Sequence, residues 1–188
     1  MNSSNEKSNQ EKIDELVELV GQTSSLGSKE TKKAVSLCRE IGNPTCEALA
    51  GIMVKDIMTR LDSDNSHTST NAALVLGKVG KMSIPVLSST VRISSYAHMA
   101  LGMVASSGKD RTAKKQAINI LKTELMSPDW MRAEAAIKGF GYSKYKKIIP
   151  VLKKLQSTTS NYDLIRACDD AITNLSPLSQ IFDLLIRK

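Results

Sequence analysis

Two stretches of this chain share one pattern, which restricts the fold more than any other feature. Residues 71–87 read NAALVLGKVGKMSIPVL and residues 132–152 read RAEAAIKGFGYSKYKKIIPVL. Each contains an apolar run, two closely spaced glycines, and then Ile-Pro-Val-Leu. An apolar run at helical spacing, a glycine turn and a proline that a first helical turn tolerates predict two helices joined by a tight turn. Since the pattern occurs twice, we expect a repeat of helix pairs.

The same periodicity extends over most of the chain. It predicts a short helix over residues 11–21 and then five helix pairs, at residues 31–41 with 45–61, 68–79 with 83–91, 94–105 with 110–126, 128–140 with 144–157, and 162–175 with 177–186. Their central turns, at Gly42, Gly80, Ala105, Gly141 and Ser176, are 38, 25, 36 and 35 residues apart. All but one of these intervals are typical of helix-pair solenoids. The expected fold is an all-α, right-handed α-solenoid of about five helix pairs.

The ends of the chain differ from this repeat region. Residues 1–10 are polar and rich in Ser and Asn, which predicts a disordered tail. Residues 11–29 form a capping helix and a loop, and residues 30–188 form the repeat domain. The sequence contains no apolar run long enough for a membrane span and no apolar segment of a secretory signal, so we expect a cytoplasmic protein without a membrane contact.

The repeat units resemble HEAT repeats, of the HEAT-like type also found in phycobilin lyase subunits. In that family the first helix carries Arg, paired Ala and a Leu-Gly step, and the second opens with Val/Ile-Pro-x-Leu. The residues that carry the resemblance are Arg132, Ala135, Ala136, Gly139, Gly141 and Ile149-Pro150-Val151-Leu152, and in the earlier copy Ala72, Ala73, Leu76, Gly77, Gly80 and Ile84-Pro85-Val86-Leu87. The earlier copy has Thr70 or Asn71 where the family has Arg. The resemblance covers roughly residues 30–188 and implies an architecture rather than an activity.

Charge is distributed unevenly along the chain. The net charge is +7, but residues 76–157 contain 15 Lys and Arg against 4 Asp and Glu, a net charge of +11. The rest of the chain has 11 against 15, a net charge of −4. This asymmetry indicates a polyanionic partner or an acidic protein surface. The acidic ends and the basic middle also make self-association possible.

Nine basic residues flank the central turns of three successive pairs. We call them the basic ridge: Lys78, Lys81, Lys109, Arg111, Lys114, Lys115, Lys144, Lys146 and Lys147. Equivalent positions of a solenoid stack along one edge, so these side chains are expected to lie in a row. Lys122, Lys153 and Lys154 lie further along the second helices and extend the ridge toward the concave side. Lysine outnumbers arginine here, which favours contacts with phosphates or carboxylates over the reading of bases.

No residue set indicates a catalytic centre, a cofactor or a metal. His67 and His98 are far apart in the sequence, and neither has a carboxylate or a cysteine at ligand spacing. We expect His98 to be a partly exposed residue of a helix. Three cysteines without a CxxC pair are expected to be reduced and mostly buried, although Cys38 and Cys46 are close enough in sequence for a redox pair. The chain is therefore predicted not to be an enzyme.

The only tryptophan, Trp130, follows Ser127-Pro128-Asp129 at the start of a predicted helix. Ser127 is expected as the N-cap and Pro128 as the first helical residue. A tryptophan at such a place usually packs under the preceding turn. The alternative comes from HEAT-like DNA glycosylases, which use Trp and Asp on a concave basic face. Asp129, Trp130 and Arg132 are the residues of that kind here, but base handling generally needs several aromatic side chains.

Together these features predict a non-enzymatic interaction scaffold. Its partner is expected to be an acidic protein segment that binds the concave face and the basic ridge. One alternative is sequence-independent binding of nucleic acid through its phosphates. The glycosylase is a further alternative.

Overall fold

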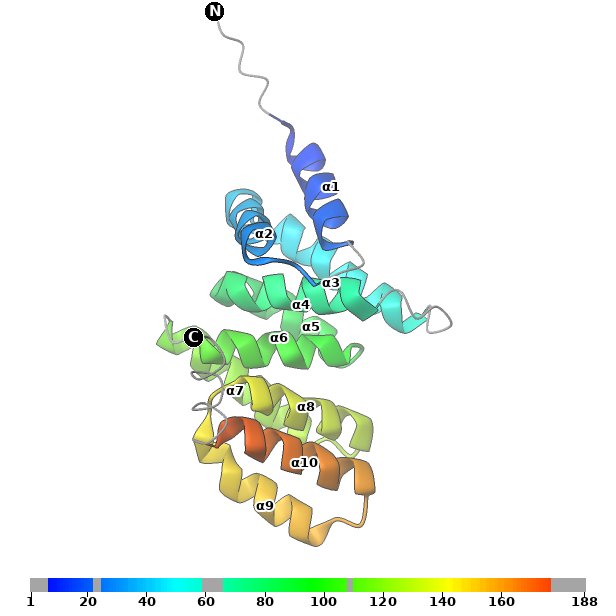
Figure 1. Cartoon of the computed structure of the whole chain (residues 1–188), viewed down its shortest axis with the longest axis vertical. Coiled ribbons are helices and arrows are strands. Elements are labelled where there is room, and N and C mark those ends of the chain that lie inside the picture. The colour runs from blue at the N-terminus through cyan, green and yellow to red at the C-terminus, as the bar shows by residue number, and fades with distance from the viewer. Residues whose placement is uncertain (1–6, 22–24, 59–65, 108–109, 177–188) are drawn as a thin grey trace, which may run out of the picture.

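The computed structural model describes residues 7–21, 25–58, 66–107 and 110–176, and within these ranges all regular structure is helical (Figure 1). The elements are α1 (Asn9–Val20), α2 (Ser28–Ile41), α3 (Asn43–Met58), α4 (Ser66–Val79), η2 (Gly80–Ser83), α5 (Ile84–Thr90), α6 (Ser95–Ser106), α7 (Arg111–Leu125), α8 (Trp130–Tyr142), η3 (Lys146–Ile148), α9 (Ile149–Thr158) and α10 (Tyr162–Leu175). The predicted all-α class is confirmed for this part of the chain. The helix predicted over residues 177–186 lies outside the described residues.

Two helix starts differ from the predictions. α1 begins at Asn9 because Ser8 and Glu11 form a capping box, in which each side chain accepts a hydrogen bond from the backbone N–H of the other residue. The predicted disorder up to residue 10 is therefore wrong at its last residues. α8 is capped by Asp129, whose carboxylate accepts from Met131 N at 3.0 Å. Ser127 is not the N-cap. Its hydroxyl oxygen accepts a hydrogen bond from the backbone N–H of Asp129, just before the helix begins.

Consecutive helices form hairpins that pack side by side. α4, α6, α8 and α10 lie next to one another in one row, and α5 and α7 lie behind it (Figure 1). α3 packs against α4 and α5, α7 packs against α6 and α8, and α9 packs against α10. α1 covers α2 and α3 at the other end of the row. No helix in the described ranges has both the length and the apolar character of a membrane span.

Three glycines allow the helices of the row to approach closely. A Cβ atom on Gly102 of α6 would lie 2.1 Å from the carbonyl oxygen of Gly139 in α8. A Cβ on Gly139 would lie 2.6 Å from the carbonyl oxygen of His98, and one on Gly77 of α4 would lie 2.5 Å from Cβ of Met103. Real Cβ contacts are not this short, so a side chain here would force the helices apart. Gly77 and Gly102 both follow a buried leucine, at equivalent places of successive first helices.

The turns need a left-handed residue at three places. Gly42 after α2 and Gly80 after α4 have φ of 92° and 84°, a conformation that glycine adopts without steric cost. In the fourth pair this role belongs to Lys144, with φ of 54°, and not to Gly141, which the sequence predicted as the central turn. Gly141 lies inside α8, because the helix continues to Tyr142. Pro85 occupies a first-turn position of α5, as predicted. Pro150 occupies the same position of α9, because this helix begins at Ile149 and not at residue 144 as predicted.

The core consists mainly of alanine and leucine from every layer. Its largest fully buried side chains include Phe140, Leu76, Leu101 and Leu121. Asn71 is a buried polar residue that ties three segments together. Its amide donates to Val20 O at 3.2 Å, and its carbonyl oxygen accepts from Leu26 N at 3.1 Å. This satisfied pair of hydrogen bonds fixes the end of α1 on α4.

Candidate functional site

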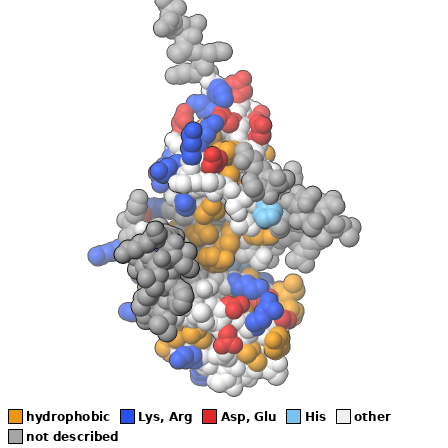
Figure 2. Space-filling view, in the orientation of Figure 1, with side chains coloured by type: hydrophobic (Ala, Val, Ile, Leu, Met, Phe, Trp, Pro, Cys, Tyr) orange, Lys and Arg blue, Asp and Glu red, His pale blue; other side chains and the backbone are white. Residues whose placement is uncertain are grey.

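The described residues of the basic ridge are distributed over the ends of α4, α7 and α8 and over η2 and η3. Lys78 is in the last turn of α4, Lys81 in η2, and Arg111, Lys114 and Lys115 are in the first turns of α7. Lys144 precedes η3, Lys146 and Lys147 are in it, and Lys153 and Lys154 are on α9. Lys109 lies outside the described residues. Lys and Arg side chains project along the left edge of the molecule in Figure 2, the side on which α6 leads into α7 and α8 into α9 in Figure 1.

None of the ridge cations has an acidic partner among the residues that the structure describes. The described ridge residues are all exposed except Lys114, which is half-buried. The one acid in their vicinity along the chain, Asp110, caps α7 by accepting from Thr112 N and Ala113 N. Lys122 instead places its ammonium group 5.4 Å from the ring centroid of Tyr145, in a cation–π contact. The ridge therefore presents uncompensated positive charge.

Two ridge residues contribute to a groove that the sequence analysis missed. This groove, which we call the cationic groove, has a volume of about 970 Å³ and is formed by α2, α4, η2, α6 and the start of α7. Four exposed cations line it, namely Lys32, Arg39, Lys78 and Lys81, with Asp110 as the one lining acid. Lys32 and Arg39 come from α2, outside the predicted ridge. A signal for Arg39 existed, since it lies in the last turn of α2 as Lys78 does in α4.

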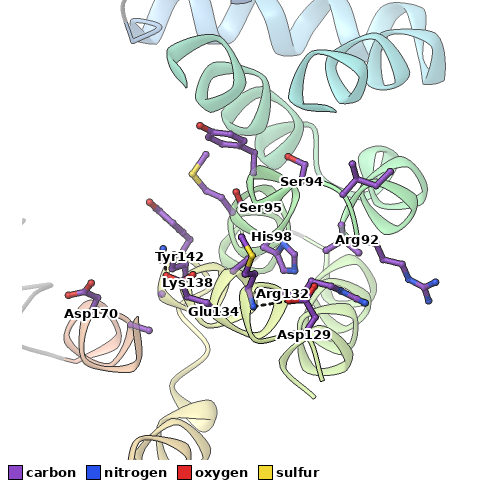
Figure 3. Close-up of a pocket in the computed structure, with 18 of the residues that line it drawn as sticks. Arg92, Ser94, Ser95, His98, Asp129, Arg132, Glu134, Lys138, Tyr142 and Asp170 are labelled. Atoms are coloured by element: carbon purple, nitrogen blue, oxygen red, sulfur yellow. Dashed lines mark hydrogen bonds and ion pairs between the residues drawn. The ribbon is translucent and has the colours of Figure 1, made fainter. Parts of the chain in front are cut away.

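A second groove runs over α6, α8 and α10 and includes the segment before α6 (Figure 3). We call it the mixed groove, and its volume is about 600 Å³. Arg92 lies on one side of it and Asp170 on the other, with His98 and Arg132 between them. Three large apolar side chains among its lining residues are strongly exposed: Ile93 at 57%, Met131 at 50% and Tyr142 at 47%. Exposed apolar side chains gathered in a concavity are typical of binding surfaces.

A group of three polar residues, the buried His98 and Glu124 and the half-buried Arg132, lies at the mixed groove. Arg132 of α8 donates to both carboxylate oxygens of Glu124 of α7, from Nε at 2.9 Å and from Nη2 at 2.8 Å. Nε2 of His98, on α6, lies 3.7 Å from Glu124 Oε2, beyond hydrogen-bond distance. His98 is 1% exposed, and neither of its ring nitrogens has a hydrogen-bond partner within the described structure. The predicted partial exposure of His98 is therefore wrong.

The sequence did contain a signal for this burial. His98 shares a helix face with Leu101 and Ala105, which are three and seven residues further on and also buried. Glu124 carried no comparable signal, because its position against His98 depends on how α7 packs on α6. Burial lowers the pKa of His98 to about 4, although the nearby Glu124 carboxylate acts in the opposite direction. The imidazole is therefore uncharged at neutral pH, and its contact with Glu124 is not a salt bridge.

The buried imidazole predicts an acid-dependent loss of stability. An unfolded chain protonates His98 near pH 6.5, whereas the folded protein does so only near pH 4. Between these values the unfolded state binds more protons, so the free energy of unfolding falls as the pH falls through this window, by about 3 kcal/mol. We expect His98→Phe to remove this part of the pH dependence. Urea unfolding of both proteins at pH 7.5, 6, 5 and 4 measures it, and parallel curves for the two would contradict it.

Trp130 differs from its prediction as well. It is 44% exposed and so does not pack beneath the preceding turn. Asp129 is exposed too, but its carboxylate is engaged as the N-cap of α8. The arginine of the same motif, Arg132, is bound to Glu124. A base-excision role for these residues is not favoured, because the Asp and Arg side chains already have structural partners.

The cysteines have no feature of a reactive or metal-binding site. Cys38, Cys46 and Cys168 are free and buried, as predicted. Burial raises their pKa to about 11, 12 and 11, so they stay protonated thiols at neutral pH. Within the described ranges, three or more His, Cys, Asp or Glu side chains do not converge anywhere in a way that could hold a metal ion.

Comparisons with protein-family models, with curated proteins and with solved structures give no match to this chain. The resemblance to HEAT-like repeats therefore stays a prediction that rests on the sequence residues named above.

Proposed function

We propose that this chain is a non-enzymatic scaffold, a right-handed α-solenoid of about five HEAT-like helix pairs that binds an acidic segment of a partner protein. Support for the repeat comes from the hairpins that follow one another along the described chain and from the glycines at equivalent places of α4 and α6. Each pair buries its apolar face against the next, as repeat proteins do.

The observation that carries the function is the uncompensated positive charge of the basic ridge and the cationic groove. Lysines that only keep a protein soluble are commonly interspersed with acids, which form weak surface pairs. Here the ridge cations have no acidic partner in the described structure. Elsewhere in the same molecule such pairs do form, for example Lys138 with Glu134 at 2.6 Å. A surface of this kind attracts an acidic polypeptide at long range and holds it at short range.

A second candidate, sequence-independent binding of nucleic acid, is favoured by the same lysines, since phosphates also satisfy point charges. The apolar side chains exposed in the mixed groove favour the protein partner. Ile93 and Met131 offer contact area that a phosphate backbone cannot use.

Charge reversal at the ridge tests the proposal. We expect Lys114→Glu/Lys115→Glu and Lys146→Glu/Lys147→Glu each to weaken binding of fluorescent poly-glutamate about tenfold or more, because each replaces two attractive charges by two repulsive ones. Helical content and the melting temperature should stay nearly unchanged, since these side chains pack against little. Fluorescence anisotropy at low and high salt measures binding, and circular dichroism measures folding.

The matched control is Lys29→Glu/Arg166→Glu, which changes the net charge equally at exposed residues outside the ridge and outside both grooves. It should leave the affinity within about threefold, the effect of net charge alone. A duplex of about 20 base pairs is the competing probe. Tighter binding of the duplex than of poly-glutamate, with a steep salt dependence, would show that the partner is a nucleic acid and not an acidic protein segment. If the ridge variants and the control lose the same amount of affinity for poly-glutamate, the ridge is not the binding surface.

A further inference from the structure

The cationic groove has a consistent arrangement of side chains on each of its walls. On α2, the lining residues recur at intervals of three or four and so share one helix face: Ser28, Thr31, Lys32, Val35, Ser36 and Arg39. On α4 and η2 the corresponding stripe contains Leu74, Gly77, Lys78 and Lys81. α6 adds Met103 and Ser106. Stripes of three successive first helices therefore meet in one concavity.

Cations and apolar side chains line the groove together. Lys32 and Arg39 come from α2, and Lys78 and Lys81 come from α4 and η2. The apolar part of the lining, which we call the floor, contains Leu74, Val79 and Met103, all half-buried, and the buried Val35. Gly77 also lines the groove, and its lack of a side chain lets Met103 pack closely against α4. Apolar side chains lie open over α4 and α6 in Figure 2, with Lys and Arg side chains above them over α1 and α2.

The described acidic residues do not neutralise the four cations. None of them forms an ion pair in the described part of the chain. Asp110 lines the groove, but its carboxylate already accepts from Thr112 N at 2.8 Å and from Ala113 N at 2.9 Å. The groove thus carries a net positive charge together with partly exposed apolar surface. A ligand that satisfies both needs acidic groups together with an apolar stripe.

We infer that the cationic groove binds an acidic amphipathic helix of the partner protein. The inference rests on the proposed function and names the segment that the partner contributes. Such a helix buries apolar residues at positions i, i+3, i+4 and i+7 against the floor, in the helix-in-groove mode of recognition. Its flanking carboxylates then meet the lysines and the arginine of both walls. A nucleic acid would supply the charge but would leave Leu74 and Met103 uncovered.

The opposite side of α2 already holds a helix of this kind within the chain. α1 is acidic, with Glu11, Asp14, Glu15 and Glu18, and it buries Leu16 and Val20. It packs on α2 and α3, where Glu15 pairs with Lys33 of α2 and Lys12 pairs with Glu40 at 2.5 Å. α2 therefore supports an acidic amphipathic helix on one face through apolar contact and a lysine. Its groove face offers the same combination, and none of the described helices lies in the groove.

The test uses the full chain and three labelled peptides of about 14 residues, roughly four turns of helix. The first has leucine at helical spacing and glutamate elsewhere. The second has the same composition in an order that removes the apolar stripe, and the third has glutamine in place of glutamate. We expect the first to bind about tenfold more tightly than either of the others, because only it offers both the stripe and the charge. Fluorescence anisotropy measures the affinities.

Variants of the protein locate the binding. Lys32→Glu/Arg39→Glu removes one wall, and Leu74→Gln/Met103→Gln makes the floor polar. Each is expected to weaken the binding of the first peptide about tenfold, whereas Lys29→Glu/Arg166→Glu should change its affinity by less than about threefold. If the floor variant does not fold by circular dichroism, the wall variant decides alone, because Lys32 and Arg39 are exposed.

The outcomes separate this inference from the proposed function. Equal binding of the first two peptides, with poly-glutamate also bound, would overturn the inference and leave the scaffold for acidic segments standing. Loss of binding to every acidic probe would overturn both. If light scattering shows that the chain alone forms dimers that the first peptide cannot dissociate, the groove belongs to a second copy, and the inference also fails.

Discussion

Gly102→Ala is expected to lower the free energy of unfolding by about 3 kcal/mol, at the upper end of the usual cost of overpacking. The new Cβ would lie 2.1 Å from the carbonyl oxygen and 3.0 Å from the carbonyl carbon of Gly139. These are backbone atoms of α8, so no side chain can rotate away. Relief requires α6 and α8 to separate, which opens the core around Leu101 and Ile137.

Urea unfolding followed by circular dichroism measures this loss, and Gly51→Ala is the matched control. Gly51 lies exposed inside α3, and a Cβ there would have no neighbouring atom within 4 Å. Because alanine favours a helix over glycine, this control should gain about 0.5–1 kcal/mol. If Gly102→Ala lowers the free energy of unfolding and Gly51→Ala raises it, the loss at Gly102 comes from the close packing of α6 against α8. A neutral Gly102→Ala would show that the two helices do not pack as tightly as described.

Arg132→Met is expected to cost about 3 kcal/mol, because it leaves the Glu124 carboxylate buried without its cation. The Glu124 side chain is only 4% exposed and receives both hydrogen bonds from Arg132. In the unaltered protein His98 is uncharged at neutral pH, chiefly because burial lowers its pKa, so Arg132 supplies the positive charge beside Glu124. The methionine retains most of the packing volume, so the loss reports the charge rather than a cavity.

The double variant Glu124→Leu/Arg132→Met is the control for this prediction. Replacing both partners by apolar groups removes the buried charge together with its partner, so it should recover most of the stability that Arg132→Met loses. Thermal and urea unfolding of the two single variants and the double variant form a complete cycle. If the double variant is as unstable as Arg132→Met, then the damage comes from lost packing, and the ion pair contributes little.

Much of the fold follows from local sequence signals. The boundaries of α10 are those predicted, and most other helices begin or end within a few residues of the prediction. Gly42 and Gly80 occupy the left-handed turns that their sequence context predicted. The exceptions are also local. Asp129 and not Ser127 is the N-cap of α8, because the helix begins later than its apolar pattern indicated. Lys144 and not Gly141 has the left-handed turn conformation, because α8 also continues further.

The candidate sites could be predicted from the sequence less completely than the fold. The sequence identified Lys78 and Lys81 as members of a basic surface, but it did not connect them with Lys32 and Arg39. It also assigned His98 to the surface and Trp130 to the interior, and the structure has the opposite arrangement for both. These errors have one origin. Spacing along a helix shows which residues share a face, whereas the rotation of that helix against its neighbours decides what the face meets.

The sequence by itself determined the all-α class, the succession of short helices and turns, and the uneven distribution of charge, because these depend on residues within one or two helical turns of each other. Only the tertiary structure decided that four cations from α2, α4 and η2 line one groove with an apolar floor, and that His98 lies buried beside Glu124 and Arg132. The groove joins Lys32 with Met103, which is 71 positions away, and Glu124 is 26 positions from His98 and 8 from Arg132. Their distances are set by how closely the helices pack at Gly77, Gly102 and Gly139, and that packing is a property of the assembled core.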